Sequence, residues 1–127
     1  MNASVESFFK NYAAALTSYS AEKISEFYQT PMAVYSDQGV LTVTEMNAVV
    51  SFWQQGIEPY NAQKIEKTVP RILSEEQLSE TIFISKVLWE NYDSSGKSVS
   101  NETNFYILSG KNGNLKISGL IIMAQGQ

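Results

Sequence analysis

The sequence predicts an α+β fold in which three N-terminal helices pack on one face of a mainly antiparallel sheet. Apolar residues recur at helical spacing in the first half of the chain, and from Lys64 onward they alternate with polar residues. The alternating segments are separated by short connections rich in turn-forming residues, which is typical of antiparallel neighbours. The length of 127 residues predicts a single domain over 1–127.

The first helix is predicted from apolar residues that return every three or four positions: Val5, Phe8, Phe9, Tyr12, Leu16 and Tyr19. A second, shorter helix follows, for which Ser20 is a suitable N-terminal cap. We expect Ile24, Phe27 and Tyr28 on its buried face. Pro31 should end it, because the residue before a proline avoids helical geometry.

A small hairpin and a third helix complete the first half of the chain. Residues 32–36 and 40–43 are expected as short strands joined by the turn at 37–39. Thr44 is the expected cap of the third helix, which Gly56 and Pro59 should end. Its inner face is predicted from helical spacing: Met46, Val49, Val50, Trp53 and Ile57.

The second half of the chain predicts a run of four strands. Their expected ranges are residues 64–73, 81–92, 98–108 and 115–123. The connections "SEEQLSE", "DSSGK" and "SGKNGN" are plausible hairpin loops. The stretch "NYDSSGKS" looks like a phosphate-binding loop, but it lacks the first glycine, and a strand follows where a helix should begin.

Composition excludes several classes of function. The net charge of −4 disfavours nucleic acid as a partner. The chain has no histidine and no cysteine, so we expect no metal site and no cofactor, and acid–base chemistry would fall to Asp, Glu, Tyr or Lys. There is no apolar run long enough to span a bilayer and no signal peptide pattern, so we expect a cytoplasmic protein without a membrane partner.

Three stretches resemble the bacterial ketosteroid isomerases, and through them the nuclear transport factor 2-like (cystatin-like) superfamily. "NYAAALTSYSAEKISEFY" is similar to their first two helices, "VVSFW" to the end of their third, and "NFYILSGKNGNLKI" to their penultimate hairpin. The resemblance, which extends to polyketide cyclase-like proteins, implies a strongly curved sheet wrapped into a cone over the helices. It also implies a homodimer formed through the sheet.

The resemblance also implies a set of catalytic positions. Tyr12 falls where the isomerases have a tyrosine that donates to the substrate oxyanion, and Asn104 falls where they have a second donor. An asparagine amide is able to donate such a hydrogen bond. The general-base position is filled by Ser36, whereas Asp37 is one residue further along. Since side chains alternate along a strand, this offset would turn Asp37 away from the cavity.

Each of these residues has a simpler interpretation. Asp37 is either a base or the first residue of a turn, and Tyr12 is either a donor or a core residue. Glu102, Asn104 and Tyr106 share one face of a predicted strand. If that face is concave, they converge on a cavity, where Glu102 would be a substitute base. If it is the outer face, they are solvated or belong to a dimer surface.

The predicted core or cavity wall consists largely of aromatic residues: Phe8, Phe9, Tyr12, Phe27, Val34, Trp53, Trp89, Phe105 and Tyr106. From these and the base position we choose the candidate ligand contacts: Phe8, Phe27, Val34, Ser36, Trp53, Trp89 and Tyr106. Trp53 and Trp89 also suit a purely structural role. Arg71, the single arginine, is either a surface residue or an anion clamp.

Three functions remain open from the sequence. The first, which we favour because the base position holds Ser36 and histidine is absent, is a domain that binds a small hydrophobic molecule in a pocket between sheet and helices. The second is an isomerase or cyclase that moves a proton next to a carbonyl, with Tyr12, Asn104 and either Asp37 or Glu102 as its catalytic residues. The third is a non-catalytic dimerisation or interaction domain.

Overall fold

The computed structural model of the chain describes residues 3–111 and 114–123. The helices are α1 (Ala3–Leu16), α2 (Ala21–Ser25), α3 (Met46–Gly56) and α4 (Glu58–Ala62). The strands are β1 (Tyr28–Ser36), β2 (Gly39–Val43), β3 (Lys67–Gln77), β4 (Ile82–Tyr92), β5 (Ser98–Ser109) and β6 (Lys116–Ile122). No helix in these ranges is long and apolar enough to cross a membrane.

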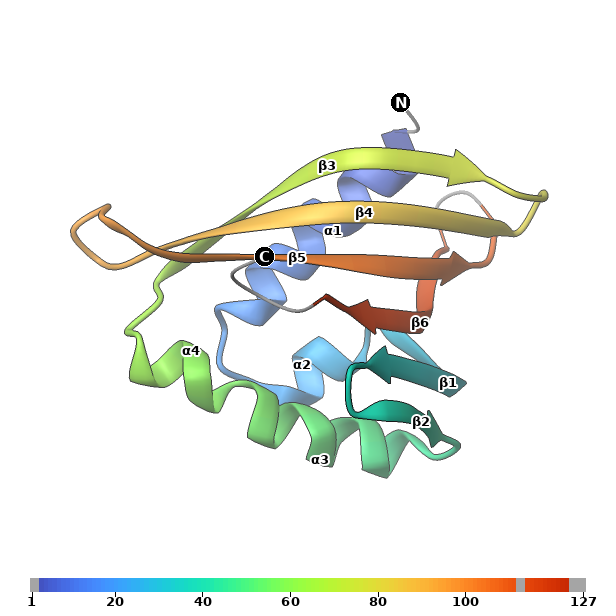
Figure 1. Ribbon diagram of the computed structural model, residues 1–127, viewed down its shortest axis with the longest axis horizontal. Helices are drawn as coiled ribbons and strands as arrows, with labels where there is room; N and C mark the ends of the chain where they lie inside the picture. Colours follow the sequence, from blue (N-terminus) through green and yellow to red (C-terminus); the bar gives the residue numbers. More distant parts are fainter. Residues whose placement is uncertain (1–2, 112–113, 124–127) are drawn as a thin grey trace.

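All six strands belong to one sheet in the order β2-β1-β6-β5-β4-β3. Neighbouring strands are antiparallel except for β1 and β6, which are parallel. Figure 1 shows α1 crossing behind the long strands, while α3 and α4 run along the side where β1 and β2 lie. The predicted α+β class, with helices against a mainly antiparallel sheet, is confirmed.

The second helix is shorter than expected. Ser20 does cap α2, since its hydroxyl accepts a hydrogen bond from the Lys23 backbone N–H at 3.2 Å. However, α2 ends at Ser25, and Pro31 lies inside β1 rather than at a helix end. Pairing with β6 explains the difference: the Ile117 N–H donates to the Phe27 carbonyl at 2.8 Å and so draws this segment into the sheet.

The third helix also differs from the prediction at both ends. Its N-cap is Glu45 rather than Thr44, and no side chain caps it. Gly56 is the last residue of α3, as expected, but Pro59 does not end helical structure. It lies in the first turn of the short helix α4, where its missing N–H costs no hydrogen bond.

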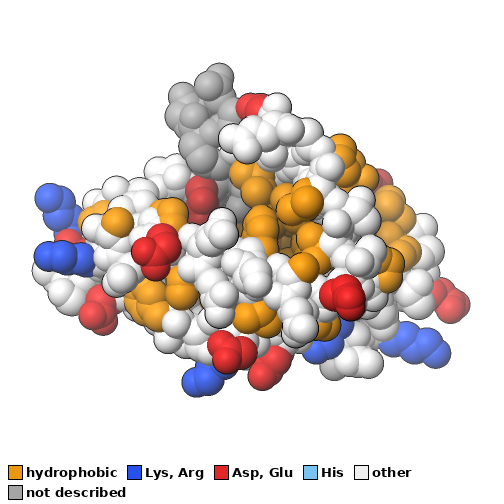
Figure 2. All heavy atoms as spheres, turned by 90° about the horizontal axis from the view of Figure 1, so that it is seen from below, with side chains coloured by type: hydrophobic (Ala, Val, Ile, Leu, Met, Phe, Trp, Pro, Cys, Tyr) orange, Lys and Arg blue, Asp and Glu red, His pale blue; other side chains and the backbone are white. Residues whose placement is uncertain are grey.

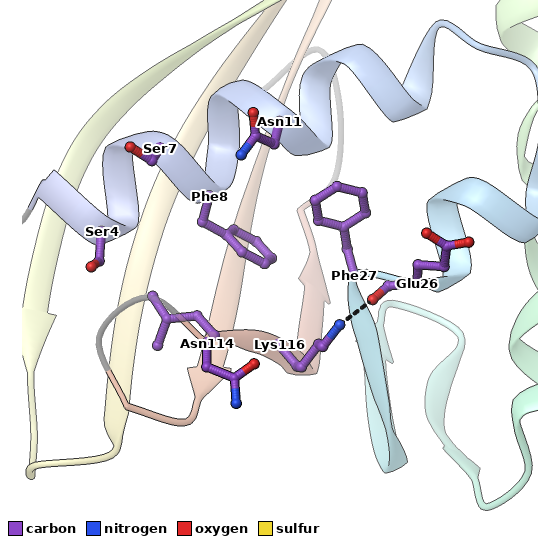
Figure 3. Close-up of a pocket in the computed structure, with 9 residues that line it drawn as sticks. Ser4, Ser7, Phe8, Asn11, Glu26, Phe27, Asn114 and Lys116 are labelled. Atoms are coloured by element: carbon purple, nitrogen blue, oxygen red, sulfur yellow. Dashed lines mark hydrogen bonds between the residues drawn. The ribbon is translucent and has the colours of Figure 1, made fainter.

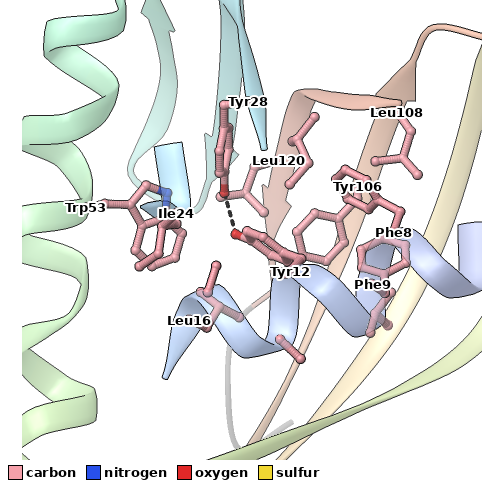
Figure 4. Close-up of a cluster of buried hydrophobic side chains, with 14 of the residues drawn as sticks. Phe8, Phe9, Tyr12, Leu16, Ile24, Tyr28, Trp53, Tyr106, Leu108 and Leu120 are labelled. Carbon is pink, nitrogen blue, oxygen red and sulfur yellow. Dashed lines mark hydrogen bonds between the residues drawn. The ribbon is translucent and has the colours of Figure 1, made fainter. Parts of the chain in front are cut away.

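Aromatic side chains from α1, β4 and β5 form the centre of the core. Phe9, Tyr12, Trp89 and Tyr106 contact one another with ring centroids 5.2 to 6.4 Å apart and mostly edge to face. Such pairs stabilise a protein beyond the area that they bury. Figure 4 shows this cluster between α1 and the inner face of the sheet.

Candidate functional site

A cavity of about 180 Å³ lies where α1, α3 and α4 meet the inner face of β5 and β6. We call it the aromatic pocket. Its lining residues are Tyr12, Leu16, Phe52, Trp53, Gly56, Pro59, Tyr60, Glu102, Asn104, Tyr106, Leu120 and Ile122. The view onto α3 and α4 in Figure 2 shows hydrophobic side chains around a hollow on this side of the molecule.

Strand alternation brings three polar side chains of β5 to the pocket. Asn104 and Tyr106 are buried and Glu102 is half-buried, and all three line the cavity. Phe105, which lies between Asn104 and Tyr106 in the sequence, is turned to the outer face. There the ammonium of Lys86 lies 5.6 Å from the centroid of its ring. Of the two predicted alternatives, the structure therefore has Glu102, Asn104 and Tyr106 on the inner face of the sheet, where they line the cavity. The prediction that Phe105 belongs to the core or cavity wall was wrong.

Helix α3 supplies one aromatic wall. Trp53 is buried and Phe52 half-buried, and their rings meet edge to face at 87° with centroids 5.7 Å apart. Gly56 allows this arrangement, because a Cβ there would come within 2.8 Å of the Trp53 ring. Replacement of Gly56 by a larger residue would therefore displace a wall of the pocket.

Two tyrosines are joined at the inner end of the pocket. The hydroxyls of Tyr12 on α1 and Tyr28 on β1 are 2.7 Å apart, and Figure 4 shows them pointing toward one another beside Trp53. Burial is the main cause that raises the pKa of both phenols above the ordinary value of about 10. Since one hydroxyl donates to the other, a single O–H proton of the pair is left over to donate elsewhere.

A tyrosine of α4 donates a hydrogen bond to Glu102. The Tyr60 hydroxyl donates to Glu102 Oε1 at 2.9 Å, across 42 residues of sequence. Burial and the adjacent carboxylate raise the pKa of Tyr60, so this phenol keeps its proton and acts as a donor. Tyr106 likewise stays protonated, because burial above all raises its pKa, and its oxygen accepts from the Trp89 indole N–H at 2.8 Å.

Two buried polar atoms of the pocket lining have no hydrogen-bond partner among the described residues. They are Trp53 Nε1 and Asn104 Oδ1. The Trp53 N–H lies close enough to the Tyr28 hydroxyl to lower the pKa of that phenol, although it does not reach hydrogen-bond geometry. A buried polar group left without a partner costs about 1–3 kcal/mol, and a bound ligand able to pair with it would remove that cost.

Several candidate residues lie outside the aromatic pocket. Asp37 is exposed at the β1–β2 turn, and the Ser36 hydroxyl beside it accepts from the Gln38 backbone N–H at 3.2 Å. Val34 is buried in the core but does not line the cavity. Trp89, 1% exposed, does not line the pocket but contacts two of its lining residues, Tyr106 and Tyr12. Arg71 forms an exposed ion pair with Glu90 at 3.0 Å.

Phe8 and Phe27 face a different hollow, a wide open groove of about 500 Å³ between α1 and the start of β6 (Figure 3). We call it the polar groove. Its lining residues are Ser4, Ser7, Phe8, Asn11, Glu26, Phe27, Asn114, Leu115 and Lys116. The Lys116 ammonium donates to the backbone carbonyl of Glu26 at 2.6 Å, which ties β6 to the end of α2.

Two residues that line the pocket, Tyr60 and Phe52, are not among the predicted site residues, nor is Tyr28, which is hydrogen-bonded to the lining residue Tyr12. Pro59 predicts a helix end, which would leave Tyr60 in a loop, whereas Pro59 in fact lies in the first turn of α4. The one available signal was a tyrosine placed directly after a proline that is compatible with a first helical turn. Among residues 3–111 and 114–123 there is no group of three acidic, histidine or cysteine side chains that could hold a metal ion.

Comparison with known proteins identifies relatives of this fold. The family described as NTF2-like protein (DUF6841) matches residues 3–125, and no curated protein matches by sequence. A cystatin-like domain of unknown function from Nostoc punctiforme has a TM-score of 0.72 at 10% identity, with 97% of this chain and 76% of that chain covered. An NTF2-like protein of unknown function from Shewanella oneidensis has a TM-score of 0.71 at 9% identity, with 95% of this chain and 97% of that chain covered.

A ketosteroid isomerase-like protein from Erwinia carotovora is similar to the same degree, with a TM-score of 0.70 at 10% identity and coverage of 98% and 96%. At such identities the likeness shows the fold alone, because one fold hosts many functions. The fold nevertheless agrees with the resemblance found in the sequence, and the family match extends over almost the whole chain. The chain therefore belongs to the NTF2-like family.

Proposed function

We propose that the aromatic pocket binds a small, largely apolar molecule. The observation that carries this proposal is a cavity walled by aromatic rings, whose lining includes two buried polar atoms without partners, Trp53 Nε1 and Asn104 Oδ1. Ligand sites in proteins usually combine an apolar wall with a few such orienting groups. Ordinary core packing, by contrast, seldom leaves a void of this size.

The size of the pocket limits its ligand. A cavity of about 150 Å³ in another protein accommodates benzene, so the 180 Å³ found here suits a molecule of about one ring. A four-ring steroid would require α3 or α4 to move. The proposed ligand is therefore much smaller than the substrates of a steroid isomerase.

Binding should be tested with neutral one-ring probes, cyclohexanone and indole, by thermal shift and protein-observed NMR. A ligand that binds the folded state stabilises it by about 2.7 kcal/mol at a hundredfold excess over Kd. Ile122, half-exposed on the pocket lining, offers a blocking variant, Ile122→Trp. The control is Asn11→Trp in the polar groove. Binding that survives Ile122→Trp but is lost in Asn11→Trp would refute the proposal.

The second candidate function is an enzyme that moves a proton next to a carbonyl. It is favoured by one observation: a carboxylate, Glu102, and two donor side chains, Tyr12 and Asn104, line the same small pocket. Glu102 would remove a proton from the carbon beside the carbonyl, and the hydrogen bonds of Tyr12 and Asn104 would stabilise the enolate oxygen. The proton would then return to carbon from Glu102.

Deuterium exchange at the carbons beside the carbonyl of cyclohexanone, in D₂O, tests this reaction. The exchange rate should fall by at least about a hundredfold in Glu102→Gln, consistent with the usual contribution of a general base. Asp37→Asn, at the exposed turn, is the matched control and should leave the rate unchanged. Exchange that is equally fast in Glu102→Gln would exclude Glu102 as the base.

For the oligomeric state we propose a homodimer through the outer face of the sheet. Lys86, Leu88 and Glu90 lie side by side on this face of β4, because the residues between them are buried inside. A two-fold axis at Leu88 would place each Lys86 opposite the partner's Glu90, so the charges are self-complementary. Light scattering should give a dimer for the wild type and for Leu78→Glu, which changes an exposed loop, but a monomer for Leu88→Glu.

A further inference from the structure

The aromatic pocket contains one negatively charged side chain and no positively charged side chain to balance it. Of its lining residues only Glu102 is charged, and neither a lysine nor the arginine reaches the cavity. Within the described ranges the ion pair found is Arg71–Glu90, on the outer surface. Tyr60 satisfies one oxygen of Glu102 with a neutral O–H, which stabilises the carboxylate without cancelling its charge.

The aromatic rings that line the pocket are inclined steeply to one another. Phe52 and Trp53 are inclined at 87°, and Tyr12 and Tyr106 at 78° with centroids 6.1 Å apart. Tyr60 adds a fifth ring beside the carboxylate. The face of each ring carries partial negative charge, and rings set around a small space form the arrangement that attracts an ammonium group.

We propose that the ligand of the aromatic pocket is a compact organic cation, an amine or a methylated ammonium group on a short apolar body. This inference rests on the proposed function, that the pocket binds a small molecule at all, and it adds the charge. A neutral ligand would displace water from the carboxylate without compensating its charge, which is unfavourable. A methylated ammonium pairs with Glu102 through its charge and packs its methyl groups against the rings.

Choline and its neutral carbon isostere 3,3-dimethylbutan-1-ol form the matched pair of probes, because they share shape and differ in charge. Isothermal titration calorimetry of the wild-type chain should show choline binding at least about tenfold more tightly than the isostere. Glu102→Gln, with its folding checked by circular dichroism, should weaken choline binding by about tenfold or more. It should not weaken binding of the isostere, because a neutral ligand no longer displaces water from a charged group. Glu26→Gln, in the polar groove, should change neither.

Each other result is decisive. If both probes bind equally well to the wild-type chain, the cation inference is wrong while the pocket remains a binding site. If choline binds more tightly but does so equally in Glu102→Gln, the assigned carboxylate is wrong and the inference fails. If neither probe binds, and cyclohexanone and indole do not bind either, both the inference and the proposed function are overturned. If only the neutral probes bind, the inference alone is lost.

Discussion

The aromatic pocket and the polar groove differ in the burial of the polar groups that line them, and this difference matters more for binding than their volumes. The groove is larger, about 500 Å³ against 180 Å³, but Ser7, Asn11 and Asn114 on its walls are exposed, so water already satisfies them. In the pocket, Trp53 and Asn104 carry buried atoms with no described partner. A ligand in the groove would have to compete with water, whereas a ligand in the pocket would be able to pair with polar atoms that have no other partner.

The two hollows also differ in what surrounds them. Behind the pocket lie hydrogen-bonded pairs that hold its walls in place, Tyr12 with Tyr28 and Trp89 with Tyr106. Across the groove, the Lys116 ammonium donates a hydrogen bond to a backbone carbonyl at the surface. Preorganised walls reduce the entropy lost on binding, so the smaller hollow is the better candidate site.

The largest expected difference between the two regions appears at alkaline pH. Tyr12, Tyr28, Tyr60 and Tyr106 have raised pKa values, whereas no tyrosine lines the groove. Above pH of about 10 the unfolded chain loses these phenolic protons and the folded chain keeps them, so stability present below that pH is lost as pH rises. Each phenol contributes up to about 1.4 kcal/mol of loss per pH unit.

Urea unfolding at a series of pH values from neutral to strongly alkaline measures this loss. The midpoint should fall steeply once the pH passes about 10, and less steeply in Tyr28→Phe, which removes one titrating group. A midpoint that stays constant through this range would mean that the phenols ionise as easily in the folded chain, and that the pocket region is open to water.

The next largest effect should come from removing one pocket wall. Tyr106→Ala deletes a ring that is 3% exposed, together with the acceptor of the Trp89 indole N–H. We expect the free energy of unfolding to fall by about 3–5 kcal/mol. Asn11→Ala, at an exposed position in the polar groove, should change it by less than about 0.5 kcal/mol.

Tryptophan fluorescence in urea compares these two variants directly. Equal losses of stability would show that the groove is as much a part of the packed structure as the pocket. A small loss in Tyr106→Ala would mean that neighbouring side chains fill the space, and that the pocket walls are not rigid.

The smallest effect concerns the contact between α4 and β5. Tyr60→Phe removes the O–H that donates to Glu102 and should lower the free energy of unfolding by about 1–2 kcal/mol. The matched control is Tyr35→Phe on β1, where the ring is 42% exposed, with an expected change within about 0.5 kcal/mol. Amide hydrogen exchange in α4 should quicken in Tyr60→Phe alone, and unchanged exchange would remove this hydrogen bond from the description of the pocket.

Much of the fold follows from periodicity in the sequence. The alternation of buried and half-buried residues along β4 is visible as alternating side-chain types, because each inner residue must pack against helices. The same alternation places Asn104 and Tyr106 on one face, as predicted. The prediction of Phe105 as core or cavity wall was wrong, because alternation turns this residue to the outer face. The ends of elements were less predictable, because pairing with β6 outweighed the helical pattern at Phe27 and Tyr28.

The site was harder to predict because its contacts join distant positions. The Tyr12–Tyr28 and Tyr60–Glu102 hydrogen bonds depend on how α1 and α4 are placed against the sheet, and no local pattern encodes that placement. Ring orientation at Trp53 depends on Gly56, which the sequence presented only as a helix end. The sequence therefore indicated several of the side chains that line the pocket, but it did not indicate which of them contact one another.

The parallel pairing of β1 with β6 has a consequence for how the chain is made. A ribosome delivers β1 early and β6 only after β3, β4 and β5, so the β1–β2 hairpin has no neighbour in the sheet until the final described strand emerges. Such distant pairing slows folding, because the entropy of closing a long loop must be lost before the contact forms. Until then the nascent chain exposes an apolar strand edge, a stage at which binding by chaperones would protect it from aggregation.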